Sequence, residues 1–226
     1  GAARLAGARS ILTFGYHEDS DFRVVSCHPT SSGLSLEVEI PDASEGRKIL
    51  SFALGMNAVH WAISAACVLA MASAAGVDVE ASAPHLTSFQ DLPGRGLSIG
   101  LDVAGHHFTL IDDSYNANPD SVKKSIEFLS SFSGRKILIL GDMLELGLNS
   151  KEFHKDIGRY AGEKNIDMLI GFGEHTKFSI ENFPNNGYFY DTESDLKQFI
   201  YNNVKSTDII LLKGSRGMKM ERFIDV

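Results

Sequence analysis

LIDDSYNANPDSV, residues 110–122, is the stretch that decides how this chain folds. An apolar run ends in two aspartates, and a short polar loop then leads to Asn118 and Pro119. Asn is a favoured helix N-cap and Pro a favoured first helical residue, so the pattern predicts a helix over residues 119–132. A buried strand that passes through a polar loop directly into a helix is the repeating unit of α/β proteins.

The same alternation of strand and helix continues from this stretch to the C-terminus. Strands are predicted over residues 97–103, 108–111, 136–140, 167–170 and 208–212, and further helices over residues 150–161, 192–204 and 218–223. In the helix over residues 150–161, Phe153, Ile157 and Tyr160 are expected to face inward. Short apolar strands separated by helices predict a doubly wound, mostly parallel, Rossmann-like α/β sheet.

The first part of the chain has a different pattern. Strands are predicted over residues 11–14, 22–26, 34–40 and 49–53, and helices over residues 57–75 and 79–88, with a helix end over residues 2–9. DLPGRG, residues 91–96, contains one proline and two glycines, which is typical of a domain boundary. We therefore divide the chain into two domains, residues 1–92 and residues 93–226.

Charge and cysteine content exclude several classes of protein. The 226 residues carry a net charge of −8, which argues against nucleic acid or an anionic membrane as the main partner, because both need a clustered cationic face. Cys27 and Cys67 have no second cysteine or histidine at metal-ligand spacing, so neither a zinc site nor a disulfide framework is expected, and a reducing cytoplasm fits best. Residues 49–77 contain no charged side chain, but their alanine and serine content, with Asn57 and His60, predicts a buried helix rather than a membrane span.

Polar side chains follow three of the predicted strands, at the point where each strand ends. We call these segments the three polar loops: residues 112–118, residues 141–147 and residues 213–217. Because ligands of a parallel sheet bind outside the carboxyl ends of its strands, the three loops predict one crevice lined by carboxylates, amides and two cations. Each loop also has a structural interpretation: Asn118 as a helix cap, Gly141-Asp142 as a turn, and residues 213–217 as a solvated loop.

Five motifs, spread over nearly the whole chain, resemble the Mur ligase family. They are TFGYHEDSDFRV (13–24), ALG with HWAIS (53–64), LIDDSYNANPDS (110–121), GRKILILGDMLELG (134–147) and LKGSRGMKMERF (212–223). The resemblance implies a three-domain cytoplasmic enzyme that uses ATP and Mg²⁺ to form an amide bond through an acyl phosphate. Within this family, DDSYNANP followed by GDMLELG resembles the members that add D-Ala-D-Ala to UDP-N-acetylmuramoyl-tripeptide in peptidoglycan precursor synthesis.

The resemblance also implies roles for individual residues. It assigns ATP binding to Arg95, Asp113, His60 and Ser64, and substrate binding to Tyr115, Asn116, Asn118, Asp142, Glu145, Lys213, Ser215 and Arg216. It assigns no certain catalytic residue and no metal ligand to these 226 residues. The chain departs from the family pattern at Trp61 and Ser64, where the family has asparagines, so Ser64 would offer a hydroxyl in place of an amide.

A Gly-x-x-Gly-Lys-Thr/Ser phosphate loop does not occur in this sequence. The resemblance therefore implies a fragment: residues 1–92 correspond to the end of the ATP-binding central domain, and residues 93–226 to the C-terminal domain. Such a fragment is expected to be inactive alone, monomeric, and neither bound to nucleic acid nor inserted in a membrane. Two alternatives stay open: a stand-alone, non-catalytic module that binds a nucleotide or the dipeptide, and a ligase similar to folylpolyglutamate synthetase, against which DDSYNANP argues.

Overall fold

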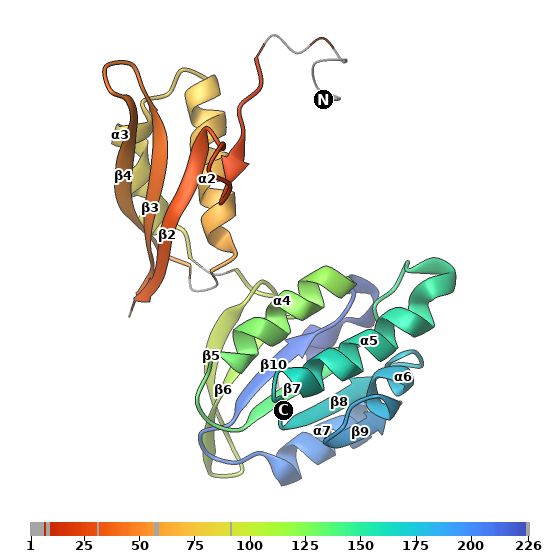
Figure 1. Cartoon of the computed structure of the whole chain (residues 1–226). Coiled ribbons are helices and arrows are strands. Elements are labelled where there is room, and N and C mark those ends of the chain that lie inside the picture. The colour runs from red at the N-terminus through yellow and green to blue at the C-terminus, as the bar shows by residue number, and fades with distance from the viewer. Residues whose placement is uncertain (1–6, 8–9, 31, 57–58, 91, 225–226) are drawn as a thin grey trace. The chain divides into compact units, whose positions relative to one another are not determined.

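The computed structural model describes residues 7, 10–30, 32–56, 59–90 and 92–224. It divides into two compact units, Gly1–Asp91 and Leu92–Val226 (Figure 1). The division falls at the DLPGRG segment. The helix end expected over residues 2–9 lies almost wholly outside the described residues.

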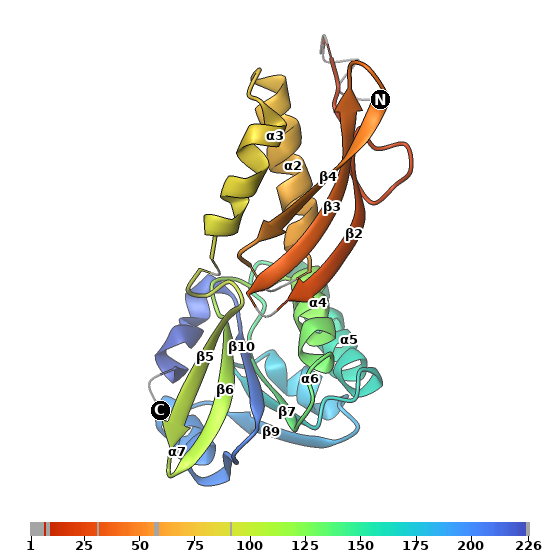
Figure 2. The same cartoon turned by 90° about the vertical axis from the view of Figure 1, so that its left-hand side faces the viewer.

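Unit 1 is a four-stranded sheet with helices on one face. The sheet order is β1-β2-β3-β4, with β1 (Phe14–Gly15), β2 (Phe22–Thr30), β3 (Gly33–Asp42) and β4 (Gly46–Leu54). β2, β3 and β4 pair antiparallel, whereas β1 pairs parallel to β2. α2 (Trp61–Ala74) packs on this sheet in Figures 1 and 2, and its buried alanines and Leu69 join the inward residues of β2, β3 and β4 in one core.

Two predicted elements of unit 1 differ in the structure. The strand expected over residues 11–14 is reduced to Phe14–Gly15. The helix expected over residues 79–88 is α-helical only in α3 (Val79–Ser82) and continues as the 3-10 helix η1 (Ala83–Ser88). Pro84 explains the change, because proline has no N–H to donate to the carbonyl one turn earlier.

Unit 2 is a six-stranded, mostly parallel sheet covered on both faces. The strand order is β5-β6-β10-β7-β8-β9. The elements are β5 (Leu97–Val103), β6 (His106–Asp113), α4 (Pro119–Ser130), β7 (Lys136–Gly141), η2 (Gly147–Asn149), α5 (Ser150–Glu163), β8 (Met168–Phe172), α6 (Thr176–Glu181), β9 (Asn186–Tyr190), α7 (Glu193–Asn203), β10 (Ile209–Lys213), η3 (Arg216–Met218) and η4 (Met220–Phe223). Only β5 and β6 pair antiparallel; the other neighbours are parallel. The predicted α/β class is confirmed.

Each face of this sheet has its own core. α4 and α5 cover one face, where Val122, Ile126 and Ile157 are fully buried, and α7 with η4 covers the other face. α6 and β9 were not predicted from the sequence. None of the helices in the described ranges has both the length and the apolar character needed to cross a membrane.

Candidate functional site

The three polar loops meet at one edge of the six-stranded sheet. β10 lies between β6 and β7, and its last residue, Lys213, is in register with Asp113 on one side and Leu140 on the other. All three strands run in the same direction and end at the same level, so residues 112–118, 141–147 and 213–217 are neighbours in space. This is the edge at which parallel α/β sheets bind ligands.

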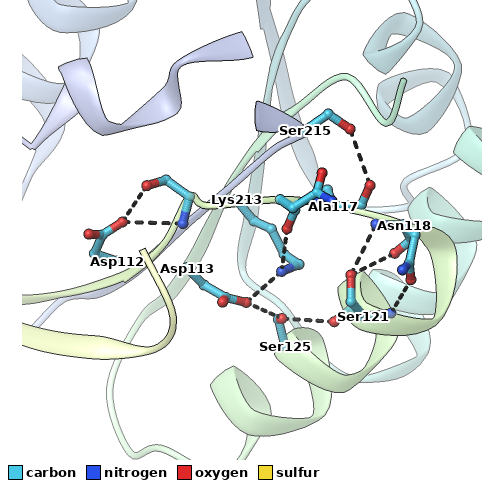
Figure 3. A network of polar contacts seen from close by, with 10 residues as sticks. Asp112, Asp113, Ala117, Asn118, Ser121, Ser125, Lys213 and Ser215 are labelled. Carbon is cyan, nitrogen blue, oxygen red and sulfur yellow. Dashed lines mark hydrogen bonds and ion pairs between the residues drawn. The ribbon is translucent and has the colours of Figure 1, made fainter. Parts of the chain in front are cut away.

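An ion pair between Lys213 and Asp113 joins the first and third polar loops. Lys213 Nζ lies 2.6 Å from Asp113 Oδ2 and donates a second hydrogen bond, of 3.1 Å, to the carbonyl oxygen of Asn116 (Figure 3). The Lys213 side chain is 3% exposed and that of Asp113 is 22% exposed. Ser125 Oγ, from α4, donates to the same Oδ2 at 2.6 Å. Among the described residues, the contacts of Asp113 all use Oδ2, which leaves Oδ1 available for a ligand hydroxyl.

Asp112, the other aspartate of residues 110–122, is buried, and its carboxylate binds mainly backbone N–H groups. Its carboxylate accepts hydrogen bonds from Gly94 N at 2.6 Å, from Ser114 N at 3.2 Å and from Ser114 Oγ at 2.5 Å. A buried carboxylate is stabilised when several donors satisfy its oxygens. Asp112 therefore binds the segment around Gly94, at the start of unit 2, to the end of β6. This structural role explains why a second acid stands beside Asp113 at this strand end.

The side chain of Ser215 links all three polar loops. Its Oγ donates to the carbonyl oxygen of Ala117 at 3.1 Å and accepts from the backbone N–H of Leu144 at 2.8 Å. Its own N–H donates to the carbonyl oxygen of Asp142 at 3.0 Å. Because Ser215 is buried and bonded on both sides, the segment that carries Arg216 is held in one place.

Two guanidinium groups approach one exposed aromatic ring at this edge. Arg95 Cζ lies 4.1 Å from the centroid of the Tyr115 ring, and Arg216 Cζ lies 5.7 Å from the same centroid. Cation–π contacts orient Arg side chains without neutralising them. Arg216 also pairs with Glu221 at 3.0 Å, but both side chains are solvent-exposed, and exposed pairs contribute little. Asn116 Oδ1 accepts from Arg216 N at 3.4 Å. The result is a cationic surface open to an anionic ligand.

The two acids of the second polar loop have different surroundings. Asp142 is buried, and its Oδ1 accepts the backbone N–H of Thr176 at 2.9 Å. Gly173 makes this approach possible, because a Cβ at this position would lie 2.7 Å from the Asp142 carboxyl carbon. Glu145 is exposed and has a φ of 63°, in the left-handed region. The carboxylate of Asp142 therefore holds the loop, whereas that of Glu145 faces solvent.

The remaining predicted site residues are Asn118, His60 and Ser64. The Asn118 side chain accepts from Ser121 N at 2.8 Å and caps α4 in a capping box, so its predicted role as N-cap is confirmed. His60 and Ser64 belong to unit 1: His60 precedes α2, with its ring centroid 5.1 Å from that of Trp61, and Ser64 is exposed on the first turn of the helix.

His154 was not predicted as a site residue from the sequence. This residue lies on α5 behind the second polar loop, where its Nε2 accepts the backbone N–H of Met143 at 3.1 Å. Phe153 and Tyr160, expected to face inward, are partly buried against the core, whereas the buried positions of α5 are His154, Ile157, Gly158 and Ala161. A histidine in phase with these apolar positions was the signal that could have identified it.

The part of the chain that the structure describes offers no cluster of three His, Cys, Asp or Glu side chains suited to a metal ion. Asp112, Asp113 and Asp142 are each engaged by protein donors. These residues therefore do not fit a Mg²⁺ site on their own.

Comparisons with known proteins agree on one family. The model of the "Mur ligase, glutamate ligase domain" matches residues 101–216, about half of the chain. The UDP-N-acetylmuramoyl-tripeptide–D-alanyl-D-alanine ligase of Rickettsia prowazekii is 27% identical over 96% of this chain and 47% of its own length; that of Bacillus subtilis is 33% identical over 73% of this chain and 37% of its own. The crystal structure of MurF from Acinetobacter baumannii is 26% identical, with a TM-score of 0.81 over 99% of this chain and 48% of the other. The chain thus spans about half the length, or less, of these relatives.

Proposed function

Because this chain belongs to the Mur ligase family, we propose that the protein carrying it is an ATP-dependent amide-bond ligase that adds D-Ala-D-Ala to UDP-N-acetylmuramoyl-tripeptide. Relatives similar over 96% and 73% of the chain carry the name of that activity. The observation that carries the proposal is the cationic edge around Tyr115, where Arg216 of the third polar loop and Arg95, which precedes β5, both approach one exposed ring. The reaction belongs to peptidoglycan precursor synthesis, in the cytoplasm, and the protein acts as a monomer.

In this proposal, Arg216 binds the carboxylate of the incoming dipeptide. A guanidinium can donate two parallel hydrogen bonds to a carboxylate, which fixes the orientation of the ligand as well as its position. Arg216 is free to do so because Glu221 holds it only through an exposed ion pair. Ser215 holds the residue before Arg216, and Asn116 accepts from the N–H of Arg216 itself. Glu145, on the neighbouring loop, adds an exposed carboxylate suited to the dipeptide ammonium group.

ATP binding in this proposal involves Asp113 and Arg95 of unit 2. Asp113 Oδ1 accepts from a ribose hydroxyl, while Lys213 and Ser125 hold the other oxygen of the same carboxylate. Arg95, stacked on Tyr115, is suited to a phosphate oxygen. The phosphate loop and the ligands of Mg²⁺ belong to residues outside this sequence, so we expect these 226 residues alone to form no amide bond.

ATP transfers its terminal phosphoryl group to the tripeptide carboxylate, which gives an acyl phosphate and ADP. The neutral dipeptide amine then attacks the acyl carbon, and phosphate leaves. The described residues contribute by holding the dipeptide in an orientation suited to this attack. Positioning of this kind accounts for a large share of the rate in two-substrate reactions. Loops bound to one another, as through Ser215, lose little freedom when the ligand arrives.

The test uses the protein at its natural length, with ATP and UDP-N-acetylmuramoyl-tripeptide as fixed substrates. We expect Arg216→Ala to raise the KM for D-Ala-D-Ala about 10- to 100-fold, the value of a charge-assisted hydrogen bond, with a smaller effect on the KM for ATP. Arg159→Ala is the matched control, because Arg159 is an exposed arginine of α5 that pairs with Asp156. A dipeptide KM equal in both variants would contradict the role of Arg216. Dipeptide or nucleotide binding without any amide product would favour the non-catalytic module.

A further inference from the structure

His154 is a fully buried histidine, and both ring nitrogens form hydrogen bonds with backbone groups. Its relative exposure is 0%. Nε2 accepts the N–H of Met143 at 3.1 Å, and Nδ1 lies 2.8 Å from the carbonyl oxygen of Ser150. Ser179 Oγ, from α6, donates to the carbonyl oxygen of His154 at 2.7 Å. Both the ring and the backbone of this residue are therefore held in place.

These contacts define the protonation state of the ring. A backbone N–H can only donate, so Nε2 must be the unprotonated nitrogen. A carbonyl oxygen can only accept, so Nδ1 must carry the proton. Neutral imidazole with the proton on Nδ1 satisfies both partners. Imidazolium would direct a second N–H against the N–H of Met143 and break that hydrogen bond.

The hydrogen bond to Met143 continues into the candidate site. Met143 is followed by Leu144, whose N–H donates to Ser215 Oγ at 2.8 Å, and the same Oγ donates to Ala117 O at 3.1 Å. His154 is thus the buried end of a chain of contacts that runs through the second polar loop to the other two loops. Its exposed end is the segment that carries Arg216.

We propose that His154, in its neutral form, is a positioning residue that holds the second polar loop against Ser215, and that protonation of its ring releases this loop. The contribution to substrate binding rests on the proposed function, because it acts through Arg216. The structural part of the inference does not, because it concerns only the hydrogen bond between His154 and Met143.

The charged and titratable groups around the ring set the direction of the pH dependence. Burial lowers the pKa of His154 below its ordinary value of 6.5. The hydrogen bond to the Ser150 carbonyl and the carboxylate of Asp142 oppose this effect, and His175, stacked at 5.5 Å between ring centroids, adds to it. A lowered pKa in the folded state means that the neutral ring stabilises the fold above pH 6.5. This contribution is lost as the pH falls from 6.5 through the lowered pKa.

The test measures amide hydrogen exchange by NMR in the 226-residue chain, expressed as protection factors so that the intrinsic effect of pH on exchange is removed. In the parent, the protection of Met143 N–H is expected to fall as the pH drops below 6.5. His154→Gln keeps an acceptor that does not titrate, so this pH dependence should disappear. His154→Leu keeps the volume but removes the acceptor, so the protection of Met143 should fall at least tenfold at neutral pH. His175→Gln is the control and should leave Met143 protected.

A companion assay uses the protein at its natural length. His154→Leu is expected to raise the KM for D-Ala-D-Ala about tenfold with a smaller change in kcat, and His154→Gln to restore it. Met143 protection that is the same in the parent and in His154→Leu, or a pH dependence that persists in His154→Gln, would overturn the inference whatever the substrate is. Absence of ligation in the parent would overturn the proposed function and leave the exchange result intact.

Discussion

The Lys213 side chain is almost fully buried, and Asp113 is its only carboxylate partner among the described residues. Removing one member of a buried pair leaves the other uncompensated. We expect Lys213→Met to lower the free energy of unfolding by about 3 kcal/mol, measured by urea denaturation followed by circular dichroism. Lys205→Met, at an exposed lysine of the same unit, should change it by less than about 0.5 kcal/mol. Equal effects would show that the ion pair contributes no more than a surface charge.

At the scale of single residues, the sequence predicted what local chemistry determines. Asn118 and Pro119 identify a helix start by themselves, and the three polar loops follow from strand ends that any parallel sheet aligns. The functions of Asp112 and His154 could not be predicted in this way. Their partners, Gly94 and Met143, lie 18 and 11 residues away, and only the folded chain brings them together.

Helices α4 and α5 are joined by a hydrogen bond from Tyr160 to Glu127, 2.7 Å long. This bond and the neighbouring charge raise the pKa of Tyr160 to about 12. The pKa is raised in the folded state, so the bond stabilises the protein below the ordinary value of 10, and this contribution is lost as the pH rises through about 12.

We expect Glu127→Gln to lower the pKa of Tyr160 toward 10, because the amide removes the charge that opposes ionisation of the phenol. Glu163→Gln is the control and should have a smaller effect, since Glu163 acts on Tyr160 through distance-dependent repulsion alone. NMR titration of labelled tyrosine would measure both values. A parent Tyr160 that titrates at the ordinary value would contradict the contact.

At the scale of elements, the long periodic segments were predicted well and the short polar ones were not. α4, α5 and α7 carry apolar residues at helical spacing over three turns, so their sequences reveal them. α6 has only six residues, and β9 is an edge strand, Asn186–Tyr190, with no buried residue. Their formation depends on contacts with α5 and β8 rather than on a pattern of their own.

The whole chain contains separate hydrophobic cores, each confined to one unit. Leu36 lies in the core of unit 1, and Leu138 in a core of unit 2. The single tryptophan, Trp61, packs on the core of unit 1, so its fluorescence reports on that unit. We expect Leu36→Ala to lower the free energy of unfolding measured by fluorescence. Leu138→Ala should lower mainly the value measured by circular dichroism, and each loss should be about 2–5 kcal/mol. Coincident curves that both substitutions shift equally would show one cooperative structure.

The division of the chain near residues 91–96 could be predicted from its proline and glycines. The kind of domain to which unit 1 belongs could not be predicted from a sequence pattern. Its antiparallel strands and short edge strand could belong to many folds. Only the resemblance suggests a part of an ATP-binding domain, and that assignment stays a prediction.

Phosphate release by the protein at its natural length, supplied with ATP and UDP-N-acetylmuramoyl-tripeptide, tests the proposed ligase activity directly. We predict release that depends on D-Ala-D-Ala and that equals the amount of new amide product. Release that is indifferent to D-Ala-D-Ala would contradict the proposed ligase activity. Release that requires glutamate, with a folate in place of the tripeptide, would favour the folylpolyglutamate synthetase alternative.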